Sequence, residues 1–419
     1  MIDIKILREN PELVKSNATR RSCTVDIDAL VKLDADYRAL LTECEEMRAL
    51  RNKLSKECAT NPAVREQVKG MKETLAAKEK LSEEQKAAID AQLAWLPNFF
   101  ADDVPVGADD KGNQLLYLGG AQPQFAFKPV DHQELFEKLG IIDTARGAKV
   151  AQAGFYYWTG AGAQLLDALF FWTKRELIAR GFSLFYTPCV AKEHTLFGTG
   201  YLPFFADQTF KLEGQDLALI GTSEQTLVGY HGDETLDAAK LPLAYTAFTP
   251  CWRTESGSYG KATRGIFRVH QFHKVEQIIF CRPEDSEKQH RRCLENEEYL
   301  LQQLGLHYRV VNVCDGDMGA PGYKKYDIEA WFAGFGDYRE VTSNTNLTDF
   351  QARRLGIKYH DKATGQKGFV HTISATAVTD RVALAIMEHY QQADGSISVP
   401  EVLRPFTGFA RILPGGGVA

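Results

Sequence analysis

Apolar residues near the start of the chain recur at alternating steps of three and four. Between residues 30 and 58 these positions are Leu30, Leu33, Tyr37, Leu40, Cys44, Met47, Leu54 and Cys58, and only Arg51 interrupts them. This is the heptad spacing of a helix that packs against a partner along one narrow stripe. The pattern therefore predicts a long helix with a helical partner.

The heptad pattern stops at Asn61-Pro62 and a second helical run follows. Its apolar positions are Val64, Val68, Met71 and Leu75, then Ile89, Leu93 and Leu96. Proline is poorly tolerated inside a helix but is well placed in the first turn of the next one. Two long helices joined by a short turn predict an antiparallel hairpin, with its free end near residue 61.

The pattern changes after Pro97-Asn98, where Gly, Pro and Asp residues predict a linker up to about residue 113. From about residue 130, short β-like runs alternate with amphipathic helices and show no regular βαβ rhythm. This mixture favours an antiparallel-rich α/β or α+β domain. The expected strands are 155–158, 217–220, 275–280 and 308–313, and the expected helices are 163–181 and 283–304. We expect a helical arm domain with its linker over 1–107 and a second domain over 108–419.

The chain has 419 residues and a net charge of -6, which by itself argues mildly against a nucleic-acid-binding protein. Charge is unevenly distributed, however. Around the predicted turn, basic residues outnumber Glu57, Glu66, Glu73 and Glu79; they are Arg48, Arg51, Lys53, Lys56, Arg65, Lys69, Lys72, Lys78 and Lys80. Two interpretations remain open: a solvated charged face on a coiled coil, or a long arm with a basic end that grips RNA.

The eight cysteines occur singly, and no C-x-x-C pair supports a zinc site or a disulfide framework. The chain contains neither G-x-G-x-x-G nor G-x-x-x-x-G-K-[ST], so a Rossmann or P-loop nucleotide site is not supported. No apolar stretch approaches the ~18 residues that cross a bilayer. The start of the chain has no secretory-signal pattern. We therefore expect a cytoplasmic protein with reduced thiols, no structural zinc and no membrane partner.

Residues 251–276 carry the strongest chemical signal. A strand-like run through Arg253-Thr-Glu255 enters a Gly-rich basic loop, and the chain returns through Arg268-Val-His-Gln-Phe272 to Glu276. The order resembles motif 2 of class II aminoacyl-tRNA synthetases, in the form that seryl-tRNA synthetases use. The alternative for such a stretch taken alone is a surface hairpin with structural ion pairs.

The resemblance implies roles for the residues of this stretch. Arg253 can place its rigid guanidinium on the ATP α-phosphate and neutralise charge during attack. Glu255 can accept from the adenine amino group, Phe272 can stack on the base, and the backbone near Val269 can bond its edge. Thr254 and His270 complete the expected ATP contacts here. Glu276 can hold the ammonium of the amino acid.

Two further stretches resemble the same family. Gly221-Thr-Ser-Glu224 is similar to its T-x-E element, so Thr222, Ser223 and Glu224 are expected to bind the α-amino group of serine. Tyr338–Arg354 is similar to its E-[IV]-[ST]-S-x-[ST]-N-x-x-D-[FY]-Q-A-R-R stretch. The resemblance places Glu340, with Ser343, on Mg²⁺ at the ATP phosphates, because hard cations take oxygen ligands. Val341 and Thr342 would contact ATP, and Asn346 would support the serine pocket.

Residues 372–381 resemble motif 3, whose arginine is Arg381 and lies on the γ-phosphate side of ATP. Arg253, Arg381 and Glu340 are thus the expected catalytic residues. The family form is close to L-N-G-[ST]-…-R, and this chain has Ser374 and Ala375 in place of Asn and Gly. Thr376 then falls where a hydroxyl reads the serine side chain. A shifted alignment would give that role to Ser374, and Thr376 would only pack.

The resemblance extends over essentially the whole chain. It implies an α+β protein with an antiparallel two-helix coiled-coil arm, followed by a class II catalytic domain built on an antiparallel sheet with flanking helices. The implied activity is a serine–tRNA ligase that uses ATP and Mg²⁺, activates L-serine and charges tRNA(Ser), with tRNA(Sec) as a further candidate acceptor. The implied assembly is a homodimer through the motif 1 region, 187–203.

Two alternatives remain beside that activity. One is a related enzyme that activates a small amino acid for a carrier other than tRNA, which the changes at Ser374 and Ala375 keep open. The other is a non-catalytic homologue that binds RNA or a partner. Such a homologue would be expected to have lost ATP-binding residues, whereas Arg253, Glu340 and Arg381 are all present.

Overall fold

The computed structural model describes residues 1–56, 61–255 and 265–419. Cys58 and the basic, Gly-rich loop expected after Glu255 lie outside the described residues. The chain divides into two compact units, Met1–Pro97 and Asn98–Ala419. Within the described residues, no helix is long and apolar enough to cross a membrane.

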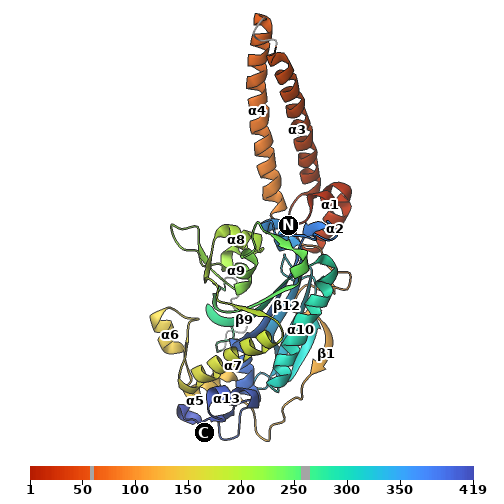
Figure 1. Ribbon diagram of the computed structural model, residues 1–419. Coiled ribbons are helices and arrows are strands. Elements are labelled where there is room, and N and C mark those ends of the chain that lie inside the picture. The colour runs from red at the N-terminus through yellow and green to blue at the C-terminus, as the bar shows by residue number, and fades with distance from the viewer. Residues whose placement is uncertain (57–60, 256–264) are drawn as a thin grey trace. The chain divides into compact units, whose positions relative to one another are not determined.

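The first unit is helical, as the sequence predicts. It consists of α1 (Ile4–Glu9), α2 (Pro11–Arg20), α3 (Ile27–Ser55) and α4 (Pro62–Leu93), and Figure 1 shows α3 and α4 as a long antiparallel pair. The side chain of Asn61 caps α4 by accepting from the backbone N–H of Ala63, and Pro62 occupies the first turn. The predicted helix start at Asn61-Pro62 is confirmed.

The stripe between α3 and α4 follows the heptad positions. Leu40, Cys44 and Leu75 are buried together, with Met47 packed against them. Asp34 is also buried, which the apolar pattern does not show. Its carboxylate accepts two hydrogen bonds from Arg8 of α1, at 2.8 and 2.7 Å, and one from Arg38. These arginines make the burial of that charge tolerable.

The second unit contains an eight-stranded sheet. Along the sheet the strands are β1 (Gln114–Gly119), β10 (Tyr308–Asn312), β11 (Lys324–Phe332), β12 (Asp337–Thr348), β15 (His371–Thr379), β9 (Gln271–Cys281), β8 (Leu243–Trp252) and β4 (Ser183–Phe185). All neighbouring strands are antiparallel except β4 and β8, which are parallel. The predicted antiparallel sheet is confirmed.

Helices cover both faces of this sheet. On one face lie α7 (Gly160–Ala179), α10 (Ser286–Gln303) and α12 (Asp380–His389), which share a core with Val275 and Ile279 of β9. On the other face α9 (Ser223–Gly229) and α11 (Phe350–Leu355) pack against Ile278 and Phe280. Because side chains alternate along a strand, β9 contributes to both cores.

Short elements connect the main ones. They are α5 (His132–Leu139), α6 (Thr144–Val150), α8 (Glu193–Gly198), α13 (Arg404–Thr407), β2 (Ile142–Asp143), β3 (Tyr157–Trp158), β5 (Val190–Ala191), β6 (Ala218–Leu219), β7 (Thr235–Asp237), β13 (Lys358–His360), β14 (Lys367–Phe369), β16 (Ile397–Ser398) and β17 (Arg411–Ile412). The strands expected at 275–280 and 308–313 are present as β9 and β10, and those at 155–158 and 217–220 shrink to β3 and β6. The helices expected at 163–181 and 283–304 are α7 and α10, and residues 283–285 form a 3₁₀ turn before α10.

Residues 98–107, which are predicted from the sequence to be a linker that belongs with the arm, are part of the second unit. The side-chain amide of Asn98 donates to the backbone carbonyls of Pro321, at 3.0 Å, and Leu347, at 2.9 Å. The backbone N–H of Asn98 donates to Ala320 O at 2.9 Å. A buried amide with these bonds fixes the start of the second unit.

Candidate active site

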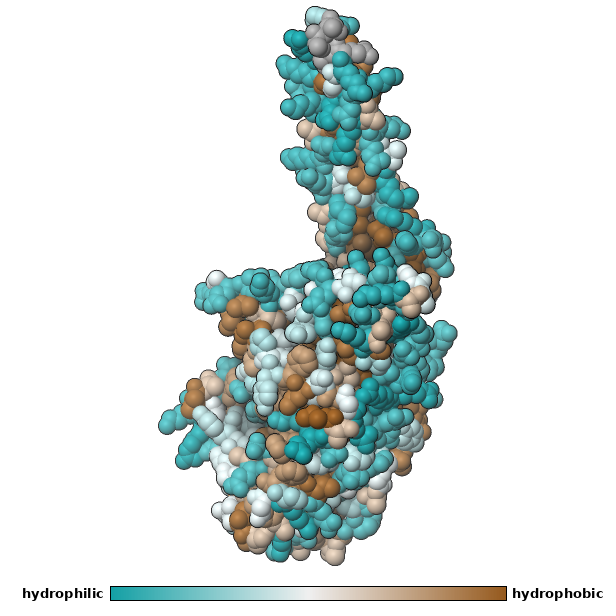
Figure 2. Space-filling model, viewed as in Figure 1, coloured by the Kyte–Doolittle hydropathy of each residue, from teal (hydrophilic) through white to brown (hydrophobic). Residues whose placement is uncertain are grey.

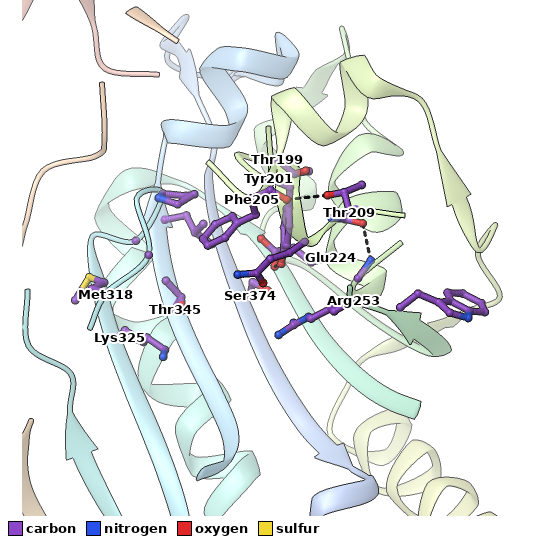
Figure 3. A pocket seen from close by; sticks show the side chains of 18 of the residues that line it. Thr199, Tyr201, Phe205, Thr209, Glu224, Arg253, Met318, Lys325, Thr345 and Ser374 are labelled. Atoms are coloured by element: carbon purple, nitrogen blue, oxygen red, sulfur yellow. Dashed lines mark hydrogen bonds between the residues drawn. The ribbon is translucent and has the colours of Figure 1, made fainter. Parts of the chain in front are cut away.

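The sheet face that carries α9 and α11 is hollowed over its central strands. Two adjoining hollows have volumes of about 320 and 480 Å³, and we refer to them as the small and the large hollow. Both are lined by Glu224, Arg253, Lys325, Thr345 and Ser374, so they form one continuous site. Figure 3 shows these five side chains around the small hollow.

Strand register explains why polar side chains meet here. Residues directly opposite each other in an antiparallel pair point to the same face. Lys325, Thr345 and Ser374 are such neighbours across β11, β12 and β15. Two residues after Ser374 on β15, and on the same face of the sheet, Thr376 lies opposite Glu276 of β9. The floor of the site therefore consists of two rows of polar side chains that lie side by side on neighbouring strands.

Three arginines line the large hollow, and two of them, Arg253 and Arg381, lie over aromatic rings. Arg253 follows β8, and its guanidinium lies 5.3 Å from the ring centre of Phe272. Arg381 lies in the first turn of α12, and its guanidinium lies 4.4 Å from the ring centre of Phe267. Arg381 also donates to the backbone carbonyl of Glu340 at 3.1 Å. Two preorganised cations in one hollow form a site for polyanions such as phosphates.

Two carboxylates face these arginines. An Oε atom of Glu340 lies 3.4 Å from Arg381, and Glu255 accepts from Arg268 at 2.9 Å. Burial opposes ionisation of Glu340, but Arg381 and the nearby Lys325 and Arg253 together hold its pKa below the ordinary value. Glu340 thus keeps its charge at neutral pH and can bind a hard cation.

Glu224 is one of two carboxylates, with Asp317, that line both hollows. It lies in the first turn of α9, and Thr222 caps that helix by accepting from the backbone N–H of Glu224 at 3.2 Å. Its carboxylate accepts from the Tyr201 hydroxyl at 3.1 Å and from the Gln351 amide at 2.7 Å. Both donors are neutral, so the negative charge of Glu224 remains available to a cationic group.

Glu276 has a different environment. Its carboxylate contacts Lys274 Nζ and accepts from the Thr222 hydroxyl at 2.8 Å. Burial raises the pKa of Glu276, while Lys274 acts in the opposite direction. Of the two carboxylates expected to bind an ammonium, Glu276 already has a cationic partner and Glu224 does not, within the part of the chain that is described.

Most site residues expected from the sequence line the hollows. They are Glu224, Arg253, Glu255, Val269, Phe272, Glu276, Glu340, Val341, Thr342, Ser343, Thr376 and Arg381. Five others do not line either hollow. Besides Thr222, these are Ser223, which is buried in α9; Thr254, which donates to Asp207 O at 2.5 Å; His270, whose ring bonds Arg253 O at 3.1 Å; and Asn346.

Asn346 points away from the site because of the strand alternation in β12. Ser343 and Thr345 face the hollow, whereas the Asn346 side chain accepts from Ser286 of α10 at 3.1 Å on the other face of the sheet. It also accepts from the backbone N–H of Thr348 at 2.9 Å. Its contacts join β12 to α10, so any effect on a substrate would be indirect.

Several residues of the site were not expected from the sequence. Lys274 could have been found, because it lies between Phe272 and Glu276 at the spacing that puts all three on one face of a strand. Lys325 could have been found only with the sheet register, which pairs it with Thr345. Tyr201 and Gln351 reach Glu224 from distant segments, and nothing local in the sequence indicates this.

Two family models match this chain. They agree with the sheet, with its polar face and with Arg253 and Arg381 of the large hollow. The description "tRNA synthetase class II core domain (G, H, P, S and T)" matches residues 209–390, which include β8, β9, β12 and β15. The description "Seryl-tRNA synthetase N-terminal domain" matches residues 1–100. The fold and the site thus define a class II aminoacyl-tRNA synthetase.

Relatives and solved structures narrow the family. Serine–tRNA ligases of Dictyoglomus turgidum and Dictyoglomus thermophilum are 43% and 44% identical, each over 99% of this chain and 100% of the relative. The crystal structure of seryl-tRNA synthetase from Pyrococcus horikoshii complexed with ATP has a TM-score of 0.94 and 38% identity, covering 99% of this chain and 100% of that one. The chain belongs to the seryl-tRNA synthetase family.

Proposed function

We propose that this chain is a serine–tRNA ligase that activates L-serine with ATP and transfers the seryl group to the 3′ end of tRNA(Ser). One observation carries the proposal. The same site holds a carboxylate without a cationic partner among the described residues, Glu224, beside a guanidinium, Arg253. An α-amino acid has the complementary ammonium and carboxylate, and the phosphates of ATP fit the arginines of the large hollow.

The proposed ATP site is the large hollow. Arg253 and Arg381 bind the phosphates there, with Arg381 on the γ-phosphate side. Phe272 stacks on adenine, Glu255 accepts from its amino group, and the backbone around Val269 binds its edge. Support comes from the arrangement of these residues around one hollow of about 480 Å³, a size in the usual range for ligand sites.

Glu340 and Ser343 are the proposed Mg²⁺ ligands. Within the described residues, no group of three or more His, Cys, Asp or Glu side chains is arranged to hold a metal ion. One carboxylate and one hydroxyl fit an ion that takes its remaining ligands from phosphate and water, as Mg²⁺ commonly does. When bound, Mg²⁺ supplies positive charge that neutralises the phosphates.

The proposed serine site is the small hollow. Glu224 accepts hydrogen bonds from the α-ammonium, and Glu276 with Thr222 supports that end of the pocket. Arg253 binds the serine carboxylate close to the α-phosphate. The serine hydroxyl reaches the polar floor, where Ser374 lines both hollows and Thr376 lines only the large one. Alanine would leave those floor groups unpaired, which disfavours its binding.

The first step needs positioning and charge neutralisation rather than a strong base. The serine carboxylate is ionised at neutral pH and attacks the α-phosphorus directly. An oxygen–phosphorus bond forms to give seryl-adenylate, and the bond to pyrophosphate breaks. Arg253 and Arg381 stabilise the charge on the phosphorus oxygens and on the leaving group. A terminal hydroxyl of the tRNA then attacks the seryl carbonyl, and AMP leaves.

The α3–α4 arm is the proposed tRNA-binding element. Figure 2 shows it covered largely by hydrophilic side chains. Lys53 and Lys56 of α3, and Lys69 and Lys72 of α4, are exposed toward the turn. Within the described residues, no ion pair is formed by any of these four lysines. Unpaired lysines on both helices suit contacts to an RNA backbone, because proteins recognise such a backbone mainly by its shape and charge.

We also propose a homodimer through the face around α7 and β4. Large apolar side chains are exposed there; Phe171 is 44% accessible, Ile178 46% and Tyr186 81%. Tyr186 directly precedes the segment 187–203, where the sequence analysis placed the dimer contact. Exposed apolar groups of this size commonly mark protein interfaces.

The cytoplasm is the proposed compartment. The seven cysteines in the described part of the chain are free thiols, and five of them are buried. Unpaired thiols are typical of proteins in reducing compartments. A cytoplasmic location also agrees with the proposed tRNA partner.

Charging of tRNA with labelled serine, measured as acid-precipitable counts, tests the proposed function. We expect ATP-dependent serylation of tRNA(Ser) at catalytic enzyme concentration. Activation of an amino acid without transfer to tRNA would instead support the enzyme that serves another carrier. Failure of both steps would support the non-catalytic homologue.

A further inference from the structure

The stretch Asp349–Arg354 is part of a family-like motif, yet the proposed function gives its side chains no task. Most of this stretch lies in α11 (Phe350–Leu355), on the same side of the sheet as α9. Gln351 of α11 is completely buried, and it lies against Glu224, the carboxylate proposed to bind the serine ammonium. A buried amide beside a functional carboxylate calls for a physical explanation.

Every polar atom of the Gln351 amide has a partner. Its Nε2 donates to Glu224 Oε1 at 2.7 Å and to Thr199 O at 3.0 Å. Its Oε1 accepts from the Thr372 hydroxyl at 2.7 Å. If the amide were reversed, its oxygen would face two acceptors, so only one orientation is compatible with these contacts. Gln351 therefore presents an N–H to Glu224 in a fixed direction.

The second oxygen of Glu224 is fixed from another segment. Tyr201 donates its hydroxyl to Glu224 Oε2 at 3.1 Å. Burial, and then the nearby charge of Glu224, raise the pKa of Tyr201 well above its ordinary value, so the hydroxyl keeps its proton. Glu224 thus accepts one neutral hydrogen bond on each oxygen and keeps its full negative charge.

Helix α11 also holds the segment that carries Tyr201. Arg354 donates to the backbone carbonyls of Phe197, at 2.9 Å, and Leu202, at 3.2 Å. Gly198 lies so close to α11 that a Cβ there would come within 2.2 Å of Leu355. The short helix α11 therefore holds in place both residues that donate to Glu224, namely Gln351 and Tyr201.

We propose that Gln351 is a positioning residue that orients the Glu224 carboxylate for the serine ammonium without neutralising it. A lysine or arginine at this place would compete with the ammonium, as Lys274 does at Glu276. An apolar residue would leave the carboxylate free to rotate away. The neutral amide of Gln351 orients the carboxylate through a hydrogen bond and adds no positive charge beside it. This inference rests on the proposed role of Glu224 in serine binding.

Serine-dependent ATP–pyrophosphate exchange with the full-length protein tests the proposal. We expect Gln351→Leu to raise the KM for serine about 10- to 100-fold, because a hydrogen bond to a charged group is worth about that factor. The KM for ATP should stay within about two-fold. Thr372→Val, which removes only the bond to Gln351 Oε1, should shift serine KM in the same direction by a smaller factor. Arg353→Ala, on the same helix, should leave it unchanged.

Gln351→Glu provides a readout that a purely structural role would not change. Two adjacent carboxyl groups share one proton, so one of them has a raised pKa. At pH 6 the shared proton can replace the amide N–H, and serine KM should be close to that of the unmodified protein. As the pH rises toward 8.5 the proton is lost, and the ratio of the two KM values should climb. This series also decides the matter if Gln351→Leu does not fold.

The outcomes distinguish failure of the positioning role of Gln351 from failure of the proposed role of Glu224. An unchanged serine KM in Gln351→Leu, or a flat KM ratio for Gln351→Glu, would overturn the positioning role if Glu224→Gln is impaired. If Glu224→Gln also keeps its serine KM, the proposed role of Glu224 fails, and the inference fails with it. If the unmodified protein shows no exchange with serine, the proposed function itself is wrong.

Discussion

Glu224 and Glu276 show how two carboxylates in one pocket can differ in use. Glu224 accepts from two neutral donors, whereas Glu276 contacts the ammonium of Lys274. A substrate ammonium gains most from the carboxylate whose charge is not already neutralised. At the residue scale, then, the environment and not the residue type decides which glutamate is proposed to meet serine.

Ser374 and Thr376 offer two hydroxyls for reading the serine side chain. They are two residues apart on β15 and face the same side, but only Ser374 also lines the small hollow with Glu224. We expect Ser374→Ala to raise serine KM about 3- to 10-fold, the usual worth of one neutral hydrogen bond, and to narrow the preference over alanine. Thr376→Val should change serine KM less.

Pyrophosphate exchange with serine and alanine measures both effects. Thr376→Ser serves as a control that keeps the hydroxyl. A larger effect at Thr376 than at Ser374 would return the hydroxyl-reading role to Thr376, as the unshifted motif 3 alignment implies.

At the scale of elements, α10 is joined to β12 by a buried histidine. His290 bonds Asn344 O through Nε2 at 3.1 Å, so Nε2 carries the proton and donates. Burial lowers the pKa of His290 to about 4. Its Nδ1 is buried and has no hydrogen-bond partner in the part of the chain that the structure describes. A proton on that nitrogen would have no acceptor, which agrees with the lowered pKa.

Because of this histidine, we expect the folded protein to lose stability in acid. In the unfolded chain His290 takes up a proton near pH 6.5, but in the folded chain only near pH 4. The unfolded state therefore binds more protons between these values, and the free energy of unfolding falls as pH drops through that window. The slope from one such group is about 1.4 kcal/mol per pH unit.

Urea unfolding at several pH values checks the prediction. His290→Gln, which keeps a donor for Asn344 O, should have a shallower dependence between pH 6.5 and 4 than the unmodified protein. Equal slopes for the two would show that His290 does not titrate as described.

The arm helices carry a second prediction at this scale. Changing Lys53, Lys56, Lys69 and Lys72 to Glu should raise the KM for tRNA by at least about 10-fold and weaken its salt dependence, because each lost phosphate contact lowers both the affinity for tRNA and the dependence of that affinity on salt. Serine activation should be unchanged, since the arm is a separate compact unit from the sheet. Charging assays between 50 and 200 mM salt measure the first effect, and pyrophosphate exchange measures the second.

A matched control uses lysines of the arm that are already paired. Lys78 contacts Glu43 and Lys86 contacts Asp90. Changing these two to Gln should leave the KM for tRNA nearly unchanged. If the quadruple variant charges tRNA normally, the proposed arm contact is wrong.

At the scale of the whole molecule, regular patterns were predictable and contacts between distant segments were not. The heptad stripe gave α3 and α4, and Asn61-Pro62 gave the start of α4, because helix periodicity and capping are local properties. Most of the site residues predicted from the motif resemblance line the hollows, although they are a minority of the lining residues. Asn346 was expected in the serine pocket, but strand alternation in β12 turns it toward α10.

Gln351 illustrates the limit of local reasoning. Its role depends on three partners, Thr199, Glu224 and Thr372, which lie up to 152 residues away from Gln351 in the sequence. The buried Asp34 is similar, because Arg8 of another helix makes its burial tolerable. Such contacts follow from tertiary packing, which periodicity and propensity do not encode.

Amino-acid-dependent ATP–pyrophosphate exchange tests the central claim most directly. The purified protein would be assayed with Mg²⁺ and, in turn, with serine, threonine, alanine, glycine and cysteine. We predict exchange with serine, with the other four far weaker, and loss of serine-dependent exchange in Arg253→Ala. Exchange that prefers another amino acid, or none with any of the five, would contradict the assignment of this site to serine activation.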